Sequence, residues 1–240
     1  MRAITAELSK LFSLLSVWVA LAIGMIVPTA IAALNSVSTR KEIALGDHTA
    51  VGIDMGYQEL AFGVIGAIII GVVAISHEYF AESGESGGGR QITTSLIAIP
   101  SRLRFLFAKA TAVAMVSAVL ASAAAIATMA AIRIVLGDHA PEIGSEDVPR
   151  LAGIVCYWVL TALLAFGITV LTRHGIVPLA ILIVNTSVVT VTYLLTRLTS
   201  LAYYFPDMAG IRMFIRNLED STVEIAPLVG GLVMTAWVAA

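Results

Sequence analysis

Residues 57–76 read YQELAFGVIGAIIIGVVAIS, and this stretch decides the fold. It contains no charged side chain after Glu59. A helix needs about 20 apolar residues to cross the hydrocarbon core of a bilayer, and this stretch supplies them. Further stretches of the chain qualify or nearly do, so the sequence predicts six spanning helices. The expected spans are residues 14–34, 57–76, 105–132, 151–171, 176–195 and 223–240.

The composition of the whole chain suits a membrane. Hydrophobic residues make up 59% of the 240 residues, charged residues only 12%, and the mean hydropathy is +0.95. Soluble domains are about 45–50% apolar and about 25% charged, so a water-soluble fold could not cover this much apolar surface. We therefore expect an all-α, polytopic membrane protein with a single domain, residues 1–240. The net charge of −2, without a basic face, argues against a nucleic-acid partner.

The two ends of the chain bear on its topology. The first apolar run is longer than that of a signal peptide and has Glu7 in the segment before it, so we expect it to remain as a helix. The last span is short and lacks a flanking tail, which predicts that a few residues follow it in the full protein. An even number of spans places both termini on one side. Because Lys and Arg divide evenly between the two sides, the positive-inside rule leaves the orientation open.

Two polar segments carry helical patterns of their own. In the first, apolar residues at helical spacing run from Ile4 to Leu15, with Glu7 and Lys10 off that stripe. This pattern predicts an interfacial amphipathic helix over about residues 1–13. The alternative is a plain extension of the first span.

The second segment is the loop between the second and third spans. Ile92, Leu96 and Ile99 stand at i, i+4 and i+7, which predicts a short amphipathic helix over residues 91–99. Pro100 should end it. A surface or re-entrant helix that only closes the loop is the alternative.

These two segments resemble the membrane-spanning subunits of type-two ABC exporters, especially those of actinobacteria. The matching residues near the N-terminus are Glu7, Lys10, Ser13, Ser16 and Trp18. Those of the loop, about residues 77–104 and the start of the next span, are Glu78, Tyr79, residues 91–96, Pro100, Arg102, Arg104 and Lys109. The last three are also suited to contact lipid headgroups or an acidic partner surface. A longer insert at residues 82–89 and the missing basic tail depart from the family pattern.

The resemblance implies a permease that exports a drug-, peptide- or lipid-like substrate, with ATP hydrolysed by two copies of a separate ATP-binding subunit. It implies a second permease copy, identical or not, in the plasma membrane with both termini cytoplasmic. Helix 91–99 would be a cytoplasmic coupling helix. The chain would be no enzyme and bind no cofactor, since ATP and magnesium belong to the partner. The implied ATPase-docking residues are Glu7, Lys10, Glu78, Arg90, Gln91, Ile92, Thr94, Leu96, Pro100, Arg102 and Arg104.

Two other classes of function stay open. One is a non-transporting membrane protein, such as an immunity or scaffolding factor. The other is a secondary transporter, which is disfavoured because the spans lack internal repeats and chains of charged residues.

Several single features have ordinary explanations. Gly63, Ala67 and Gly71 recur at four-residue spacing, which favours close helix packing within the chain or at a dimer seam. Asn185 interrupts the fifth span and should bond a neighbouring helix or line the transport path.

The remaining polar features predict no chemistry. Glu59 and Arg133 lie near outer span ends and should snorkel to the interface. No histidine stands at metal-ligand spacing, so no metal site is predicted. Residues 84–91 lack the Lys and the Ser or Thr of a phosphate-binding loop. The apolar loop 196–222 predicts interfacial anchoring through Tyr203–Phe205, or, as the alternative, a short re-entrant or interfacial helix that closes the outer end of the pathway.

Overall fold

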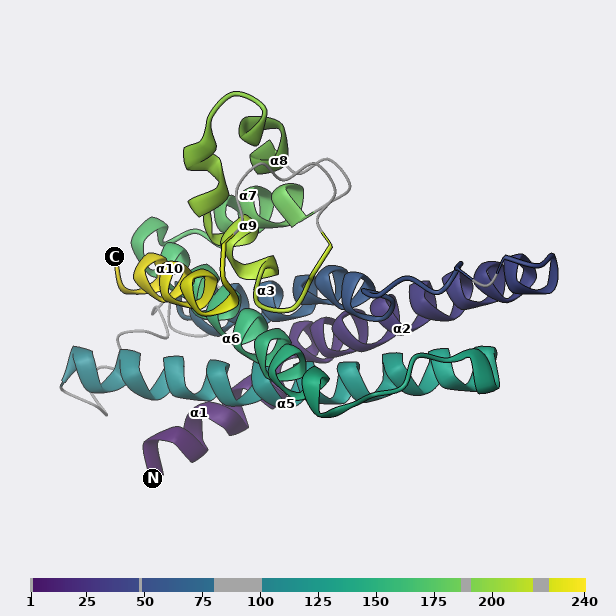
Figure 1. Cartoon of the computed structure of the whole chain (residues 1–240). Helices are drawn as coiled ribbons and strands as arrows, with labels where there is room; N and C mark the ends of the chain where they lie inside the picture. Colours follow the sequence, from purple (N-terminus) through teal and green to yellow (C-terminus); the bar gives the residue numbers. More distant parts are fainter. Residues whose placement is uncertain (1, 48, 80–100, 187–190, 218–224) are drawn as a thin grey trace.

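The computed structural model describes residues 2–47, 49–79, 101–186, 191–217 and 225–240, and no strand occurs among them. The first helices are α1 (Arg2–Ser13), α2 (Leu15–Ala44), α3 (Tyr57–Tyr79), α5 (Arg102–Leu136) and α6 (Val148–Thr172). The later ones are α7 (Ile176–Thr186), α8 (Val191–Thr196), α9 (Pro206–Ile211) and α10 (Pro227–Ala239). Short 3-10 helices are η2 (Gly137–His139), η3 (Ser145–Asp147) and η4 (Ser200–Tyr204). Both chain ends lie toward the end of the bundle where α5 begins (Figure 1).

Helix α3 is the centre of the bundle. In its most apolar window 61% of the residues are buried inside the chain, against 28% for α2. Helices α2, α5 and α6 all pack on α3, and α5 also packs on α2 and α6. The outer helices bury only a stripe and leave large apolar side chains such as Trp18, Ile26 and Val119 exposed. Such surfaces are suited to contact with lipid.

Small residues set the distance between α3 and its neighbours. Gly71 lies so close to Ala162 of α6 that an added Cβ would overlap the carbonyl oxygen of Ala162. At Gly63 an added Cβ would meet Trp158 of α6 at 2.6 Å. The buried Ala67 completes the stripe. The predicted small-residue stripe therefore packs within the chain, and the alternative of a dimer seam is wrong for these residues.

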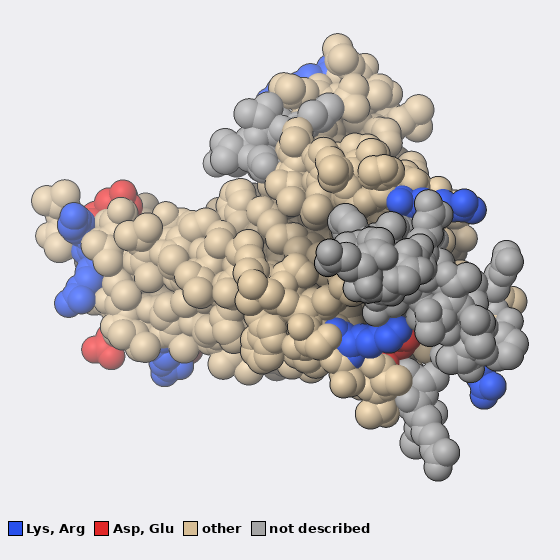
Figure 2. Space-filling view, turned by 180° about the vertical axis from the view of Figure 1, so that it is seen from behind, with Lys and Arg blue, Asp and Glu red and all other residues tan. Residues whose placement is uncertain are grey.

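Among the described residues, four helices are long and apolar enough to cross a membrane: α2, α3, α5 and α6. They correspond to the first four expected spans, and α2 continues to Ala44, well beyond its expected end at residue 34. Helix α2 has 30 residues and α5 has 35, because backbone hydrogen bonding continues through polar residues. On the face drawn in Figure 2, Lys, Arg, Asp and Glu gather toward the ends of the long helices, and the middle bears none.

The fifth and sixth expected spans are not confirmed. Helix α7 has 11 residues and α10 has 13, which correspond to about 17 and 20 Å against a hydrocarbon core of about 30 Å. Residues 187–190 of the fifth stretch lie outside the described residues; on either side of them, the side-chain oxygen of Asn185 accepts from the backbone N–H (3.2 Å) and the hydroxyl (2.8 Å) of Thr192. This bond joins α7 to α8.

The apolar segment after α8 folds back onto the bundle. Met208, Ala209 and Gly210 of α9 are buried, and Gly210 packs against the ring of Tyr157 in α6. Helix α10 covers α9, and its Trp237 donates to the carbonyl of Tyr204 (2.9 Å). The segment is therefore part of the packed core.

The N-terminal helix is joined to the bundle by one residue. Helix α1 confirms the expected N-terminal helix, and Leu14 alone separates it from α2, with extended backbone angles of φ −89° and ψ 125°. The alternative of a plain extension of the first span is therefore wrong, because the helix is interrupted at Leu14.

Candidate functional site

The N-terminal helix is held where α3 ends and α5 begins. Lys109 Nζ of α5 donates to Glu7 Oε2 of α1 at 2.6 Å and to the carbonyl oxygen of Ala74 in α3 at 3.1 Å. Both charged side chains are 5% exposed. The ammonium group also lies 5.2 Å from the centre of the Phe105 ring, close enough for a cation–π attraction. One buried lysine thus connects three helices.

The position of Glu7 differs from the expectation that it lies off the buried stripe. Its side chain is buried on the same helix face as Leu11, because Lys109 compensates its charge. The partner is 102 residues away in the sequence, so no local pattern could reveal the pair. The geometry makes Glu7 a residue that holds α1 against α5.

The other predicted docking residues that the structure describes gather at the same end. Lys10 and His77 line a small recess of about 50 Å³ beside Lys109. Arg104 is exposed, and its N–H donates to the Ser101 hydroxyl that begins α5 (3.4 Å). Glu78 stands in the last turn of α3 and Arg102 in the first turn of α5. The rest lie outside the described residues: Arg90, Gln91, Ile92, Thr94, Leu96 and Pro100.

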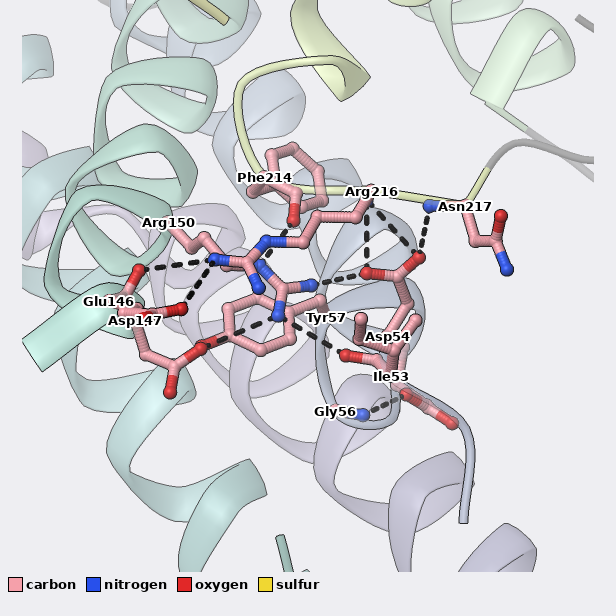
Figure 3. A network of polar contacts seen from close by, with 11 residues as sticks. Ile53, Asp54, Gly56, Tyr57, Glu146, Asp147, Arg150, Phe214, Arg216 and Asn217 are labelled. Carbon is pink, nitrogen blue, oxygen red and sulfur yellow. Dashed lines mark hydrogen bonds and ion pairs between the residues drawn. The ribbon is translucent and has the colours of Figure 1, made fainter. Parts of the chain in front are cut away.

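At the opposite end of the bundle, a buried arginine connects three separate parts of the chain (Figure 3). Arg150, in the first turn of α6, donates through Nε to the carbonyl of Phe214 (2.9 Å) and through Nη1 to that of Ile53 (3.2 Å). Its Nη2 pairs with the carboxylate of Asp54. The guanidinium carbon lies 3.5 Å from the centre of the Tyr57 ring.

Asp54 completes this network. Its carboxylate also accepts from the backbone N–H of Arg216 (3.0 Å) and of Asn217 (2.6 Å). The side chains of Asp54 and Arg150 are 2% and 7% exposed, so each depends on the other for compensation of its charge. No pattern in the sequence predicts their contact, because 96 residues separate them. The network joins the segment before α3, the start of α6 and the chain after α9.

Beside this network lies a partly open cavity of about 850 Å³. Ligand pockets measure about 300–1,000 Å³. Its wall includes Glu59, whose oxygens accept from the side-chain amide of Asn35 and the backbone N–H of Gly56, each at 2.8 Å. Glu59 is 5% exposed. The prediction that it snorkels is wrong, because internal donors replace water.

The remaining predicted polar residues are also placed. Asn185 lines the same cavity while bonding Thr192. Arg133 is exposed at the end of α5. Within the described ranges, no group of three or more His, Cys, Asp or Glu could hold a metal ion.

Comparison with known proteins finds no relative: no family model matches the chain, and neither a curated protein nor a solved structure is similar to it. The functional argument therefore depends on the residues described above.

Proposed function

We propose that this chain is the membrane-spanning permease subunit of an ATP-binding-cassette exporter. In this proposal it moves a drug-, peptide- or lipid-like substrate out of the cytoplasm, using ATP hydrolysed by two copies of a separate subunit. A second permease copy completes the complex in the plasma membrane. Helices α7–α8 and α10 complete six spans, with both termini cytoplasmic.

The observation that carries the proposal is the buried Glu7–Lys109 pair. It fixes an amphipathic helix, α1, at the end of the bundle from which the α3–α5 connection leaves. That connection contains residues 91–99, the proposed coupling helix. Both segments that resemble the exporter family thus start from one end of the bundle. This arrangement supports a single docking surface for an ATPase.

The same contacts support a route for motion from the ATPase to the spans. Lys109 bonds α1 and α3 from α5, so a displacement of the docking surface would move these helices together. At the far end, the cavity lies between α2, α3, α6, α7 and α9. A relative movement of these helices would change the shape of the cavity and release its contents.

The test uses the full-length, affinity-tagged chain purified in mild detergent from its native membranes. We expect magnesium-dependent, vanadate-sensitive ATP hydrolysis to co-purify with it. The double variant Ile92→Asp/Leu96→Asp places charge on the apolar face of the coupling helix and should abolish that activity at equal membrane expression. Ala98→Asp, on a different face of the same predicted helix, is the matched control and should retain it. Wild-type chain without ATPase activity, or a double variant with undiminished activity, contradicts the proposal.

A further inference from the structure

The cavity beside α3 is lined by acidic side chains. Three carboxyl groups line it, those of Asp54, Glu59 and Asp207, and among the described residues no Lys, Arg or His lines it. Asp54 is compensated by Arg150. Glu59 is not: its two hydrogen-bond donors, Asn35 and the Gly56 amide, are neutral. No ion pair joins Glu59 to another described residue. Both of its oxygens accept a hydrogen bond from these donors, and neither donor supplies a compensating charge.

The second carboxylate, Asp207 of α9, has buried oxygens that make no well-formed hydrogen bond with the described residues. Burial raises the pKa of Asp207, and weak hydrogen bonds from the Thr192 side chain, the Met208 backbone and the Asn185 side chain oppose that shift. A buried carboxylate with incomplete hydrogen bonding costs free energy, which a donor from a ligand or water can offset. Asp207 therefore marks a place in the wall that can accept a donor or a positive charge.

The rest of the wall suits an apolar body. Phe62, Tyr157, Ile211 and Ile215 line the cavity together with the two carboxylates. Aromatic rings attract cations through their faces, and aliphatic side chains provide apolar contact. An anion would be repelled by this wall, and a neutral ligand would leave the charge of Glu59 uncompensated.

We propose that this cavity binds an amphipathic organic cation, with its positive charge near Glu59 and Asp207 and its apolar part against Phe62, Tyr157, Ile211 and Ile215. The claim that such a cation is the exported substrate rests on the proposed function. The claim that the cavity binds such a cation does not depend on it.

The test measures equilibrium binding of radiolabelled tetraphenylphosphonium to the purified full-length chain in detergent, with empty micelles as the blank. Tetraphenylborate has nearly the same size and shape but a negative charge, so it separates charge recognition from apolar partitioning. We expect saturable binding of the phosphonium and no competition by the borate. Equal competition by the borate, or no saturable phosphonium binding, overturns the proposal.

Variants identify the site. Asp207→Asn should weaken binding about tenfold, the effect of one favourable charge contact. Glu59→Gln should do the same, but its new N–H would face the donors Asn35 and Gly56 and could unfold the chain. Ser38, exposed on α2 and lining the cavity, avoids that problem. Ser38→Lys should weaken binding at least tenfold, and Ser38→Gln, of similar length, should not.

Unchanged binding in both Asp207→Asn and Ser38→Lys overturns the site assignment. Because this measurement needs no ATPase, its failure is distinct from failure of the exporter proposal. If the chain binds the phosphonium but purifies without ATPase activity, the ligand site is supported and the exporter proposal is contradicted. If the chain has coupled ATPase activity but does not bind the phosphonium, the exporter proposal is supported and the ligand class is contradicted.

Discussion

Lys109 and Glu7 form a buried ion pair between the first helix and the third long helix of the bundle, with Nζ and Oε2 2.6 Å apart. The Lys109 ammonium group also donates a hydrogen bond to the backbone carbonyl of Ala74 in α3. The pair thus fixes an element that hydropathy assigns only to the membrane surface.

Replacing Lys109 with Met should release α1 from the bundle. The substitution leaves the Glu7 carboxylate buried without a cation, which costs about 3–5 kcal/mol. Undocking of α1 relieves that cost, so hydrogen–deuterium exchange should accelerate in residues 2–13 and stay unchanged in α3. The double variant Glu7→Leu/Lys109→Met should restore protection, because two apolar side chains then face each other. Glu42→Gln, exposed at the far end of α2, is the control. Undiminished protection of α1 in Lys109→Met would refute the role of the pair.

Arg150→Lys should destabilise the opposite end of the bundle. A lysine keeps the charge but cannot donate at once to Phe214, Ile53 and Asp54 with the fork of an arginine. We expect a loss of about 2–3 kcal/mol, measured as a lower thermal midpoint by tryptophan fluorescence in detergent. Arg216→Met is the matched control: its backbone N–H still bonds Asp54 and its side chain is 44% exposed. Equal midpoints for the two variants would contradict this account.

Gly71→Ala should lower the thermal midpoint, since the new methyl group would meet the Ala162 carbonyl and force α3 and α6 apart. Overpacking of this kind costs about 1–3 kcal/mol. Gly167→Ala in α6 is the control, because no atom of the described residues lies within 4 Å of the added Cβ. That variant should be neutral or slightly stabilising, since alanine favours helix over glycine by about 1 kcal/mol. A Gly71→Ala variant as stable as Gly167→Ala would show that the close approach is not tight.

The proposed orientation predicts opposite labelling of the two ends of α5. With Cys156 replaced by Ala, Arg104→Cys should react with a membrane-impermeant maleimide only after the cells are opened. Asp138→Cys, exposed just beyond the other end of the helix, should react in intact cells. The two positions lie at opposite ends of a helix of 35 residues, which is about 50 Å long. The reverse labelling pattern would place the docking end of the bundle outside the cell and would contradict the exporter proposal.

Hydropathy was sufficient to predict α2, α3, α5 and α6. Each has more apolar residues in succession than a soluble helix carries, and that property is local in the sequence. It could not predict the hydrogen bond from the Thr192 hydroxyl to the Asn185 side chain within the apolar stretch 176–195, because a hydropathy window averages over single polar residues.

The polar contacts could not be predicted for a different reason. Asp54 and Arg150, or Glu59 and Asn35, come from segments far apart in the chain, and each residue alone looks like an ordinary charge at a span end. Only packing brings them together and makes their burial tolerable. The cavity is likewise a product of packing, because its wall combines α2, α3, α6, α7 and α9.

The single residue between α1 and α2 has a mechanical consequence. A connection of one residue, Leu14, leaves little freedom for α1 to move independently of α2. Lys109 of α5 also holds α1 through its bond to Glu7. A pull on the N-terminal helix therefore loads α2 along the chain and α3 and α5 across it. A force applied to α1 is therefore transmitted to α2, α3 and α5 through direct contacts, without passing through a loop.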